Sequence, residues 1–151
     1  MERLDRIVGR LALPLVVAVL VVLPVAAFGY DRHINSQAPS GAKAFWIYFD
    51  GRQGWTERRV SGWNELFHRH PAPLKEITVR KGDLVVLRLM ATDVHHGFAL
   101  PAFGVGPVEL VPGHYYEVRF RADRVGRFAM FCPLYCGLAH ADMHGWLVVR
   151  P

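Results

Sequence analysis

The chain has 151 residues, a net charge of +5 and 52% hydrophobic residues. This length accommodates one domain and a short extension, and it excludes a large second catalytic domain. The sequence contains neither internal repeats nor low-complexity tracts. It also lacks an open carboxylate pair and a nucleophile with a nearby base, so nothing in it predicts substrate chemistry.

The N-terminal region predicts a membrane anchor. Residues 11–28 are eighteen residues without a charge, about enough to cross a bilayer core of roughly 30 Å. Three arginines among the first ten residues place the N-terminus in the cytoplasm by the positive-inside rule. We therefore interpret residues 1–30 as a single uncleaved transmembrane helix in a bacterial plasma membrane. A secretory signal cleaved near Val25–Ala27 is the alternative.

The anchor is followed by a predicted linker and by the start of a periplasmic domain. Residues 31–44 are polar and contain Pro39 and Gly41, which is typical of a linker. Residues 45–49 are aromatic and predict the first strand of a domain that extends from residue 45 to residue 151. Residues 50–74 predict no regular element; a segment of this length is expected to hold a short helix or a docking surface, with Trp55 and Trp63 as its apolar side chains.

Beyond residue 74 the pattern is that of short strands. Ile77 and Val79 alternate with polar residues, and residues 81–83 predict a turn into a strand over residues 84–90. Residues 116–121 alternate with one apolar and one polar face, and residues 127–131 follow another turn. Because these strands are short and no amphipathic helix separates them, the domain is predicted to be mainly β, a sandwich or a barrel.

The densest chemical signal is a motif near the C-terminus. The segment F-C-P-L-Y-C-G-L-A-H-A-D-M-H-G-W-L-V-V contains the only two cysteines, Cys132 and Cys136, followed by His140 and Met143. Thiolate, imidazole and thioether ligands together favour copper, because zinc and iron–sulfur sites rarely use methionine. The apolar residues 146–149 predict a strand that follows this segment and fixes its C-terminal end. The motif therefore predicts a copper-binding loop.

A copper site needs a further ligand from elsewhere in the chain, and T-D-V-H-H-G-F contains the best candidates. His95 and His96 follow the strand predicted over residues 84–90, and in an extended backbone they point to opposite sides. Only one of them can therefore face a metal. The remaining histidines are expected to be surface residues: His33, His68, His70, His114 and His144.

Two copper geometries fit these residues. A mononuclear blue-copper centre needs two histidines, one cysteine and a weak methionine, and it leaves Cys132 as a thiol prone to oxidation. A dinuclear centre uses both sulfurs as bridges, with one imidazole on each copper, Met143 as a weak ligand and a backbone carbonyl as another. The second cysteine favours the dinuclear centre.

These two motifs resemble the CuA domain of cytochrome c oxidase subunit II over about residues 75–150. The resemblance implies a cupredoxin-like Greek-key β-sandwich with a mixed-valence dinuclear copper. Matched residue by residue, it implies that His96 is the upstream ligand and that Cys132 and Cys136 are the bridging thiolates. It further implies that Leu134 contributes its carbonyl and that His140 and Met143 complete the set.

The sequence departs from most members of that family in two ways. Leu134 stands where most members have a glutamate. This change keeps the backbone carbonyl as a ligand but removes a carboxylate that can hold magnesium at a subunit interface. The chain also has one predicted membrane helix where most members have two. Both departures resemble the short subunit II of B-type haem–copper oxidases.

The resemblance implies a function in respiratory electron transfer. The chain is expected to accept electrons from cytochrome c or another small periplasmic carrier and to pass them to haem in subunit I, which reduces oxygen. Its other expected partner is membrane lipid, and no nucleic-acid partner is expected. Beyond residue 30 the chain has 15 Lys and Arg against 11 Asp and Glu. This excess predicts an acidic or neutral donor, or apolar docking through the region of Trp55 and Trp63.

Several other functions fit part of the pattern. A free-standing membrane-tethered carrier or a nitric oxide reductase subunit could use the same copper centre, whereas nitrous oxide reductase adds a catalytic domain that does not fit this length. A copper chaperone with a thioredoxin-like fold also uses C-P-x-x-C with histidine, but early in its chain. A periplasmic disulfide between Cys132 and Cys136 would leave the spacing of His140 and Met143 unexplained.

Overall fold

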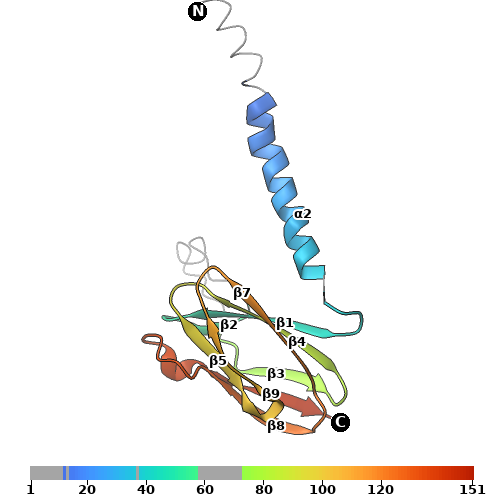
Figure 1. The fold of residues 1–151 in the computed structure, drawn as a ribbon, viewed down its shortest axis with the longest axis vertical. Coiled ribbons are helices and arrows are strands. Elements are labelled where there is room, and N and C mark those ends of the chain that lie inside the picture. The colour runs from blue at the N-terminus through green and yellow to red at the C-terminus, as the bar shows by residue number, and fades with distance from the viewer. Residues whose placement is uncertain (1–11, 13, 37, 58–72) are drawn as a thin grey trace, which may run out of the picture. The chain divides into compact units, whose positions relative to one another are not determined.

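The computed structural model describes residues 12, 14–36, 38–57 and 73–151, and it divides into two units at Pro39–Ser40 (Figure 1). The N-terminal unit is helical: a π-helical segment η1 (Ala18–Val22) continues into α2 (Leu23–Ser36). The helix therefore extends six residues into the segment predicted as linker. In the ranges described, no helix combines the length and the apolar character that a membrane crossing requires. The three N-terminal arginines lie outside these ranges.

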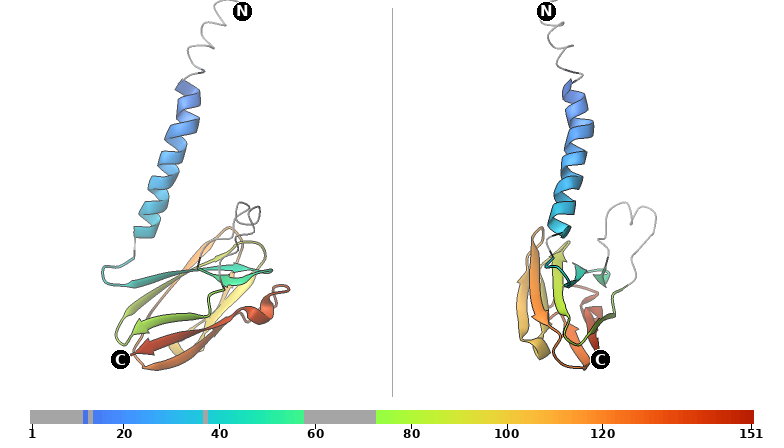
Figure 2. Two further views of the ribbon diagram at one scale, coloured as in Figure 1. Left: turned by 180° about the vertical axis from the view of Figure 1, so that it is seen from behind. Right: turned by 90° about the vertical axis from the view of Figure 1, so that its right-hand side faces the viewer.

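The second unit is a sandwich of two β-sheets (Figure 2). The first sheet has the order β2-β1-β4-β7, with the bounds β1 Lys43–Asp50, β2 Gly54–Thr56, β4 Leu84–Ala91 and β7 Tyr115–Arg121. The second sheet has the order β3-β9-β8-β5-β6, with the bounds β3 Glu76–Arg80, β5 His96–Leu100, β6 Val105–Leu110, β8 Gly126–Phe131 and β9 His144–Arg150. Two short 3-10 helices, η2 (Pro101–Phe103) and η3 (His140–Asp142), lie in the connections.

The strands form where apolar residues alternate with polar ones. In β3, Ile77 and Val79 are buried while their neighbours are exposed, which is the pattern of a strand with one face against the core. The inner faces of both sheets meet in one core cluster that includes Phe49, Leu87 and Phe98. The predicted strands over residues 45–49, 84–90, 116–121, 127–131 and 146–149 are confirmed, each with ends shifted by a few residues.

Part of the segment for which no regular element was predicted, residues 50–74, lies within the ranges that the structure describes. Residues 50–53 form a tight turn, in which the Asp50 carboxylate accepts hydrogen bonds from the N–H groups of Arg52 and Gln53. The turn leads into β2, where Trp55 is 1% exposed and packs on Phe49. The expectation that Trp55 forms a docking surface is therefore wrong, because its ring belongs to the core. Trp63, His68 and His70 lie outside the described residues.

One cationic side chain, that of Arg88, is buried on the outer face of the first sheet. Arg88 in β4 alternates with the core residues Leu87 and Leu89, so its side chain points away from the core, yet it is only 2% exposed. Its Nε lies 3.2 Å from a carboxylate oxygen of Glu117 on the adjacent strand β7, with which it is paired in register. The guanidinium also lies 5.5 Å from the centre of the Trp46 ring.

Candidate metal centre

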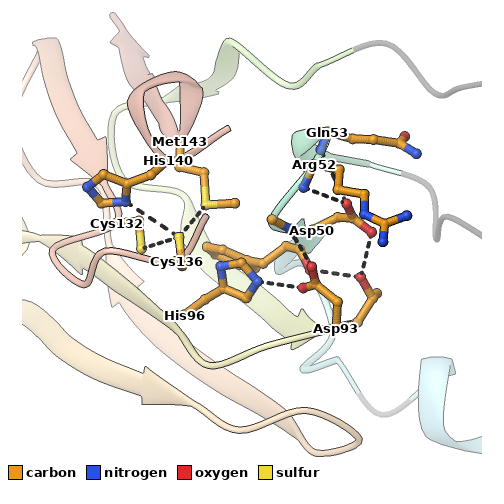
Figure 3. A network of polar contacts seen from close by, with 12 residues as sticks. Asp50, Arg52, Gln53, Asp93, His96, Cys132, Cys136, His140 and Met143 are labelled. Carbon is orange, nitrogen blue, oxygen red and sulfur yellow. Dashed lines mark hydrogen bonds and ion pairs between the residues drawn. The ribbon is translucent and has the colours of Figure 1, made fainter. Parts of the chain in front are cut away.

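The loop that carries both cysteines is closed at its base like a hairpin. β8 and β9 pair antiparallel up to Phe131 and His144, and the Cys132 N–H donates to the Met143 carbonyl at 3.0 Å. Residues 132–143 between these points therefore form a loop with fixed ends. Within it, η3 turns the chain so that the side chains of His140 and Met143 face back toward the cysteines (Figure 3).

The two cysteines lie together as free thiols. Both are 6% exposed, and their Sγ atoms are 3.6 Å apart. A disulfide needs a separation of about 2.05 Å, so the two sulfurs are neighbours without a covalent bond. Two adjacent buried sulfurs with free lone pairs form a site for a soft metal ion.

His96 approaches these sulfurs from the start of β5. Its side chain is fully buried, and its ligand atom lies within 4.8 Å of both Sγ atoms. Its Nε2 contacts the Asp93 carboxylate at 2.8 Å, while Nδ1 has no hydrogen-bond partner among the described residues. A buried ring nitrogen without a partner is costly unless a ligand satisfies it. The unpaired nitrogen and the adjacent sulfurs therefore fit a metal ion.

The remaining predicted residues surround the same two sulfurs. The Cys136 Sγ lies 3.4 Å from Nδ1 of His140 and 3.2 Å from Sδ of Met143, which is 1% exposed. The Cys132 Sγ lies 3.1 Å from the Leu134 carbonyl oxygen. The structure thus brings all six residues named from the sequence into one cluster of thiol, imidazole, thioether and carbonyl groups.

The surroundings favour ionisation of one thiol over the other. Burial raises the pKa of Cys132, but contact with His96 and the Gly97 N–H, which donates to Sγ at 3.2 Å, lowers it to about 7. Burial and the adjacent Cys132 raise the pKa of Cys136 to about 12. Cys132 is therefore the thiol that ionises first, and a thiolate is the form that binds a metal.

Asp93 holds His96 in place, a role that was not predicted from the sequence. Burial raises the pKa of its carboxyl, but hydrogen bonds from His96 and from the N–H groups of Val94 and Gly51 outweigh burial and lower it. The Gly51 N–H donates to the second carboxylate oxygen at 2.7 Å. The carboxylate thus links the imidazole to the turn between β1 and β2 (Figure 3). The motif T-D-V-H-H contained this signal, since an acidic residue three positions before a ligand can accept its second ring N–H.

The turn between β1 and β2 also contacts the cysteine loop directly. The Ala139 N–H donates to the Gly51 carbonyl at 2.9 Å. A Cβ atom at Gly51 would lie 2.7 Å from the Cys136 carbonyl oxygen and 2.9 Å from a carboxylate oxygen of Asp93. Only glycine therefore allows this approach between backbone segments.

Replacing Gly51 by alanine is expected to displace Cys136 and Asp93 and to reduce copper retention by about tenfold. An effect of about this size is typical when a group that orients a metal ligand is removed. The control is Gly29→Ala, where a Cβ meets no atom within 4 Å. Copper retained by each variant during dialysis against a chelator measures the effect. Equal retention in the two variants would contradict the close contact.

His95, His114 and His144 lie outside the cluster. His95 is 55% exposed and pairs with Glu109 at 3.1 Å, so the prediction that His95 and His96 point to opposite sides is confirmed. His114 and His144 are exposed, and each contacts a nearby backbone carbonyl.

The surface over the cluster is apolar. Leu134 is 40% exposed, Tyr135 78% and Leu138 92%. The Tyr135 ring contacts the His140 imidazole in a tilted arrangement, with ring centres 5.4 Å apart. The loop that holds the buried sulfurs thus carries an exposed apolar rim of Leu134, Tyr135 and Leu138.

Comparison with known proteins assigns the domain to a family. The family described as cytochrome c oxidase subunit II, periplasmic domain, matches residues 74–150. A cytochrome c oxidase subunit 2 from Thermus thermophilus is 34% identical over 84 residues, 56% of this chain and 59% of that protein. A second Thermus thermophilus subunit 2 has the same identity, and the match covers 48% of its length. The chain thus spans about half the length of these relatives.

A solved structure supports the same assignment. The periplasmic domain of subunit II of cytochrome oxidase from Bradyrhizobium japonicum is 25% identical with a TM-score of 0.54, covering 75% of this chain and 87% of that chain. The nitrous-oxide reductase of Stutzerimonas stutzeri is also similar, at 32% identity over 82 residues, but the match covers only 13% of that enzyme. The fold is therefore a cupredoxin-like β-sandwich.

The matched segment contains the whole Cys132–Met143 loop together with His96 and Asp93. The residues that form the buried cluster thus all lie within the match. The chain belongs to the cytochrome c oxidase subunit II family, and its cluster of histidine and two cysteines lies in the family's periplasmic copper domain, the CuA domain.

Proposed function

We propose that this chain is the electron-transfer subunit of a haem–copper terminal oxidase. The observation that carries the proposal is the pair of free buried sulfurs 3.6 Å apart, flanked by the imidazoles of His96 and His140. Such a donor set matches a dinuclear copper centre better than a mononuclear one, because no thiol is left without a role. The comparisons support the assignment through the family's periplasmic domain.

The residues that would hold the two coppers are those of the cluster. Cys132 and Cys136 would bridge, His96 and His140 would each bind one copper, and Met143 and the Leu134 carbonyl would be weak ligands. When bound, the copper pair supplies a one-electron centre whose charge is shared by two metals. The protein contributes the rigid frame: a loop closed at both ends, an imidazole fixed by Asp93, and burial that excludes water.

The proposed arrangement in the membrane follows from the N-terminal sequence. Residues 1–30 would form a single transmembrane anchor, residues 31–44 a connection that includes the end of α2, and residues 45–151 the copper domain on the periplasmic or outer face. The partner that receives electrons would be the haem-bearing subunit I. The closer resemblance to B-type oxidases stays a prediction, supported by Leu134 in place of glutamate.

The electron donor is proposed to be neutral or acidic, or to dock on apolar groups. The excess of Lys and Arg over Asp and Glu opposes attraction of a basic cytochrome c. The apolar rim of Leu134, Tyr135 and Leu138 offers a docking surface in place of Trp55, which is buried. Reduction by a basic cytochrome is expected to show a rate that does not fall as ionic strength rises. A rate that falls steeply with salt in stopped-flow experiments would overturn this proposal.

Replacing Asp93 by alanine is expected to weaken copper binding by about 10–100-fold, because His96 loses the carboxylate that orients it. Competition with a copper chelator measures the change. The exposed pair of His95 and Glu109 provides the control, since Glu109→Ala removes a carboxylate from a histidine outside the cluster. An equal effect of both variants would show that general charge, and not orientation of His96, sets the affinity.

The oxidase assignment is tested by purifying the tagged full chain from membranes of its own host. We expect haem to copurify and the preparation to consume oxygen when a reductant is supplied. The Cys136→Ser variant should still copurify with haem, but its preparation should no longer consume oxygen. A preparation with two coppers per chain but without haem would favour the free-standing tethered carrier instead.

A further inference from the structure

The sandwich has a second polar site at the end away from the cysteine loop, where β1 begins and where β3 and β9 end. It is a pocket of about 540 Å³. Its polar lining consists of Lys43, Thr78, Arg80, Asp83 and Arg150. Lys43 belongs to one sheet, and Arg80 and Arg150 belong to the other, so both sheets contribute to the lining of the pocket. The copper site does not use any of these residues.

The pocket gathers three cationic side chains, Lys43, Arg80 and Arg150, against one carboxylate, Asp83. Arg80 and Arg150 are direct partners in the register of the parallel strands β3 and β9. Like charges on neighbouring strands repel each other, and an anion bound between them would offset that repulsion. Among the described residues, no carboxylate forms an ion pair with Lys43, Arg80 or Arg150.

The single acidic residue of the lining, Asp83, offsets one of the three positive charges and also stabilises a turn. One carboxylate oxygen of Asp83 accepts the backbone N–H of Arg80 at 2.9 Å, which closes the turn between β3 and β4. Beside the pocket, the Arg121 guanidinium donates to the Gly82 carbonyl at 2.9 Å and adds a further cation. The site therefore fits an anion with several oxygens, and guanidinium groups match the oxygens of a phosphate group in pairs.

The chain connection limits how far this pocket can lie from the membrane. Lys43 follows the last residue of α2, Ser36, by seven residues. Seven residues span at most about 25 Å even when fully extended. The proposed anchor ends at residue 30, and the six helical residues from there to Ser36 add about 9 Å. The tether therefore keeps Lys43 within about 35 Å of the bilayer surface, and the inference rests on the proposed anchor.

We infer that the pocket formed by Lys43, Arg80 and Arg150 binds the phosphate group of an anionic phospholipid. Such a contact holds the copper domain against the bilayer at a point distant from the copper loop. It also leaves the apolar rim over the copper site free for protein partners.

The test uses the full chain in detergent, with lipid retention measured by native mass spectrometry after addition of phosphatidylglycerol or phosphatidylcholine. The variant is Arg80→Gln/Arg150→Gln. The matched control is Arg124→Gln/Arg127→Gln, which removes two exposed guanidiniums elsewhere on the same domain. We expect the wild type and the control to retain phosphatidylglycerol preferentially, and the variant to lose about tenfold in that preference.

Each outcome has a distinct meaning. Equal loss in variant and control would overturn the pocket assignment. Displacement of the lipid by millimolar inorganic phosphate, with phosphate itself retained, would assign the site to a free anion and overturn the lipid inference. Because the measurement needs no membrane insertion, failure of the anchor proposal is detected separately, by extraction of the chain from membranes with carbonate. Copper content, measured on each variant, reports on the proposed function independently.

Discussion

Replacing Cys136 by serine is expected to abolish the dinuclear centre and to weaken copper binding by more than about a hundredfold. This exceeds the loss of about 10–100-fold that is typical when a group that only orients a metal ligand is removed. Cys136 contacts three other members of the cluster: Cys132, His140 and Met143. A serine hydroxyl is a hard oxygen donor, and it cannot bridge two soft metal ions as a thiolate does. Copper per chain, measured after gel filtration, should fall from two to fewer than one.

The same loss is expected for Cys132→Ser, because both sulfurs are needed as bridges. Met130→Leu is the matched control: it removes a fully buried sulfur from β8, and an isosteric swap in a core costs less than about 1.5 kcal/mol. This variant should retain two coppers per chain. Retention of a stable single copper by Cys132→Ser, with His96, Cys136, His140 and Met143 intact, would instead indicate that the mononuclear blue-copper interpretation is correct.

Replacing Glu117 by alanine is expected to lower the free energy of unfolding by about 3 kcal/mol. Arg88 is 2% exposed, and the change removes the carboxylate that lies 3.2 Å from its guanidinium. Loss of one partner from a buried ion pair is costly because the remaining charge stays out of water. Urea unfolding, followed by tryptophan fluorescence, measures the difference.

The comparison for this variant is Glu76→Ala. Glu76 and Arg127 form an exposed pair at 4.0 Å, and such pairs contribute about 0–1 kcal/mol. Equal destabilisation by the two substitutions would contradict a special role for the buried pair. The double variant Arg88→Met/Glu117→Leu, which replaces both charges by apolar groups, should recover most of the lost stability.

The contribution of Glu117 should also depend on pH. Burial raises the pKa of its carboxyl, but hydrogen bonds and charge from Arg119 and Arg88 lower it below the ordinary value of 4.5. The folded state therefore favours the ionised form, and the pair stabilises the fold above that ordinary value. The contribution is lost as the pH falls through the lowered pKa. The stability difference between wild type and Glu117→Ala should shrink accordingly on acidification.

The strands and the cysteine loop could be predicted from the sequence because their signals are local. Alternation along residues 76–80 and 116–121 depends only on neighbouring residues, and so does the spacing of Cys132, Cys136, His140 and Met143. The prediction that only one of His95 and His96 faces the metal was also local, because adjacent residues of a strand face opposite sides. The family resemblance then selected His96 and supplied Leu134.

The features that were not predicted from the sequence depend on contacts between segments that lie far apart in the chain. Gly51 approaches Cys136 and Asp93 from a turn that carries no ligand, and one glycine in a polar turn gives no sign of such a contact. The pairing of Arg80 with Arg150 joins strands separated by most of the domain sequence. The burial of Trp55 was misjudged for the same reason, because Phe49 and Phe98 cover it from other strands.

The most direct test of the copper centre is the copper content of the wild-type full chain together with its electron paramagnetic resonance spectrum. The account predicts two coppers per chain and a hyperfine pattern from one unpaired electron shared by two copper nuclei. One copper per chain with splitting from a single nucleus would contradict it and leave Cys132 without a role. Absence of stable copper, with a reversible disulfide between Cys132 and Cys136, would contradict it in favour of a chaperone.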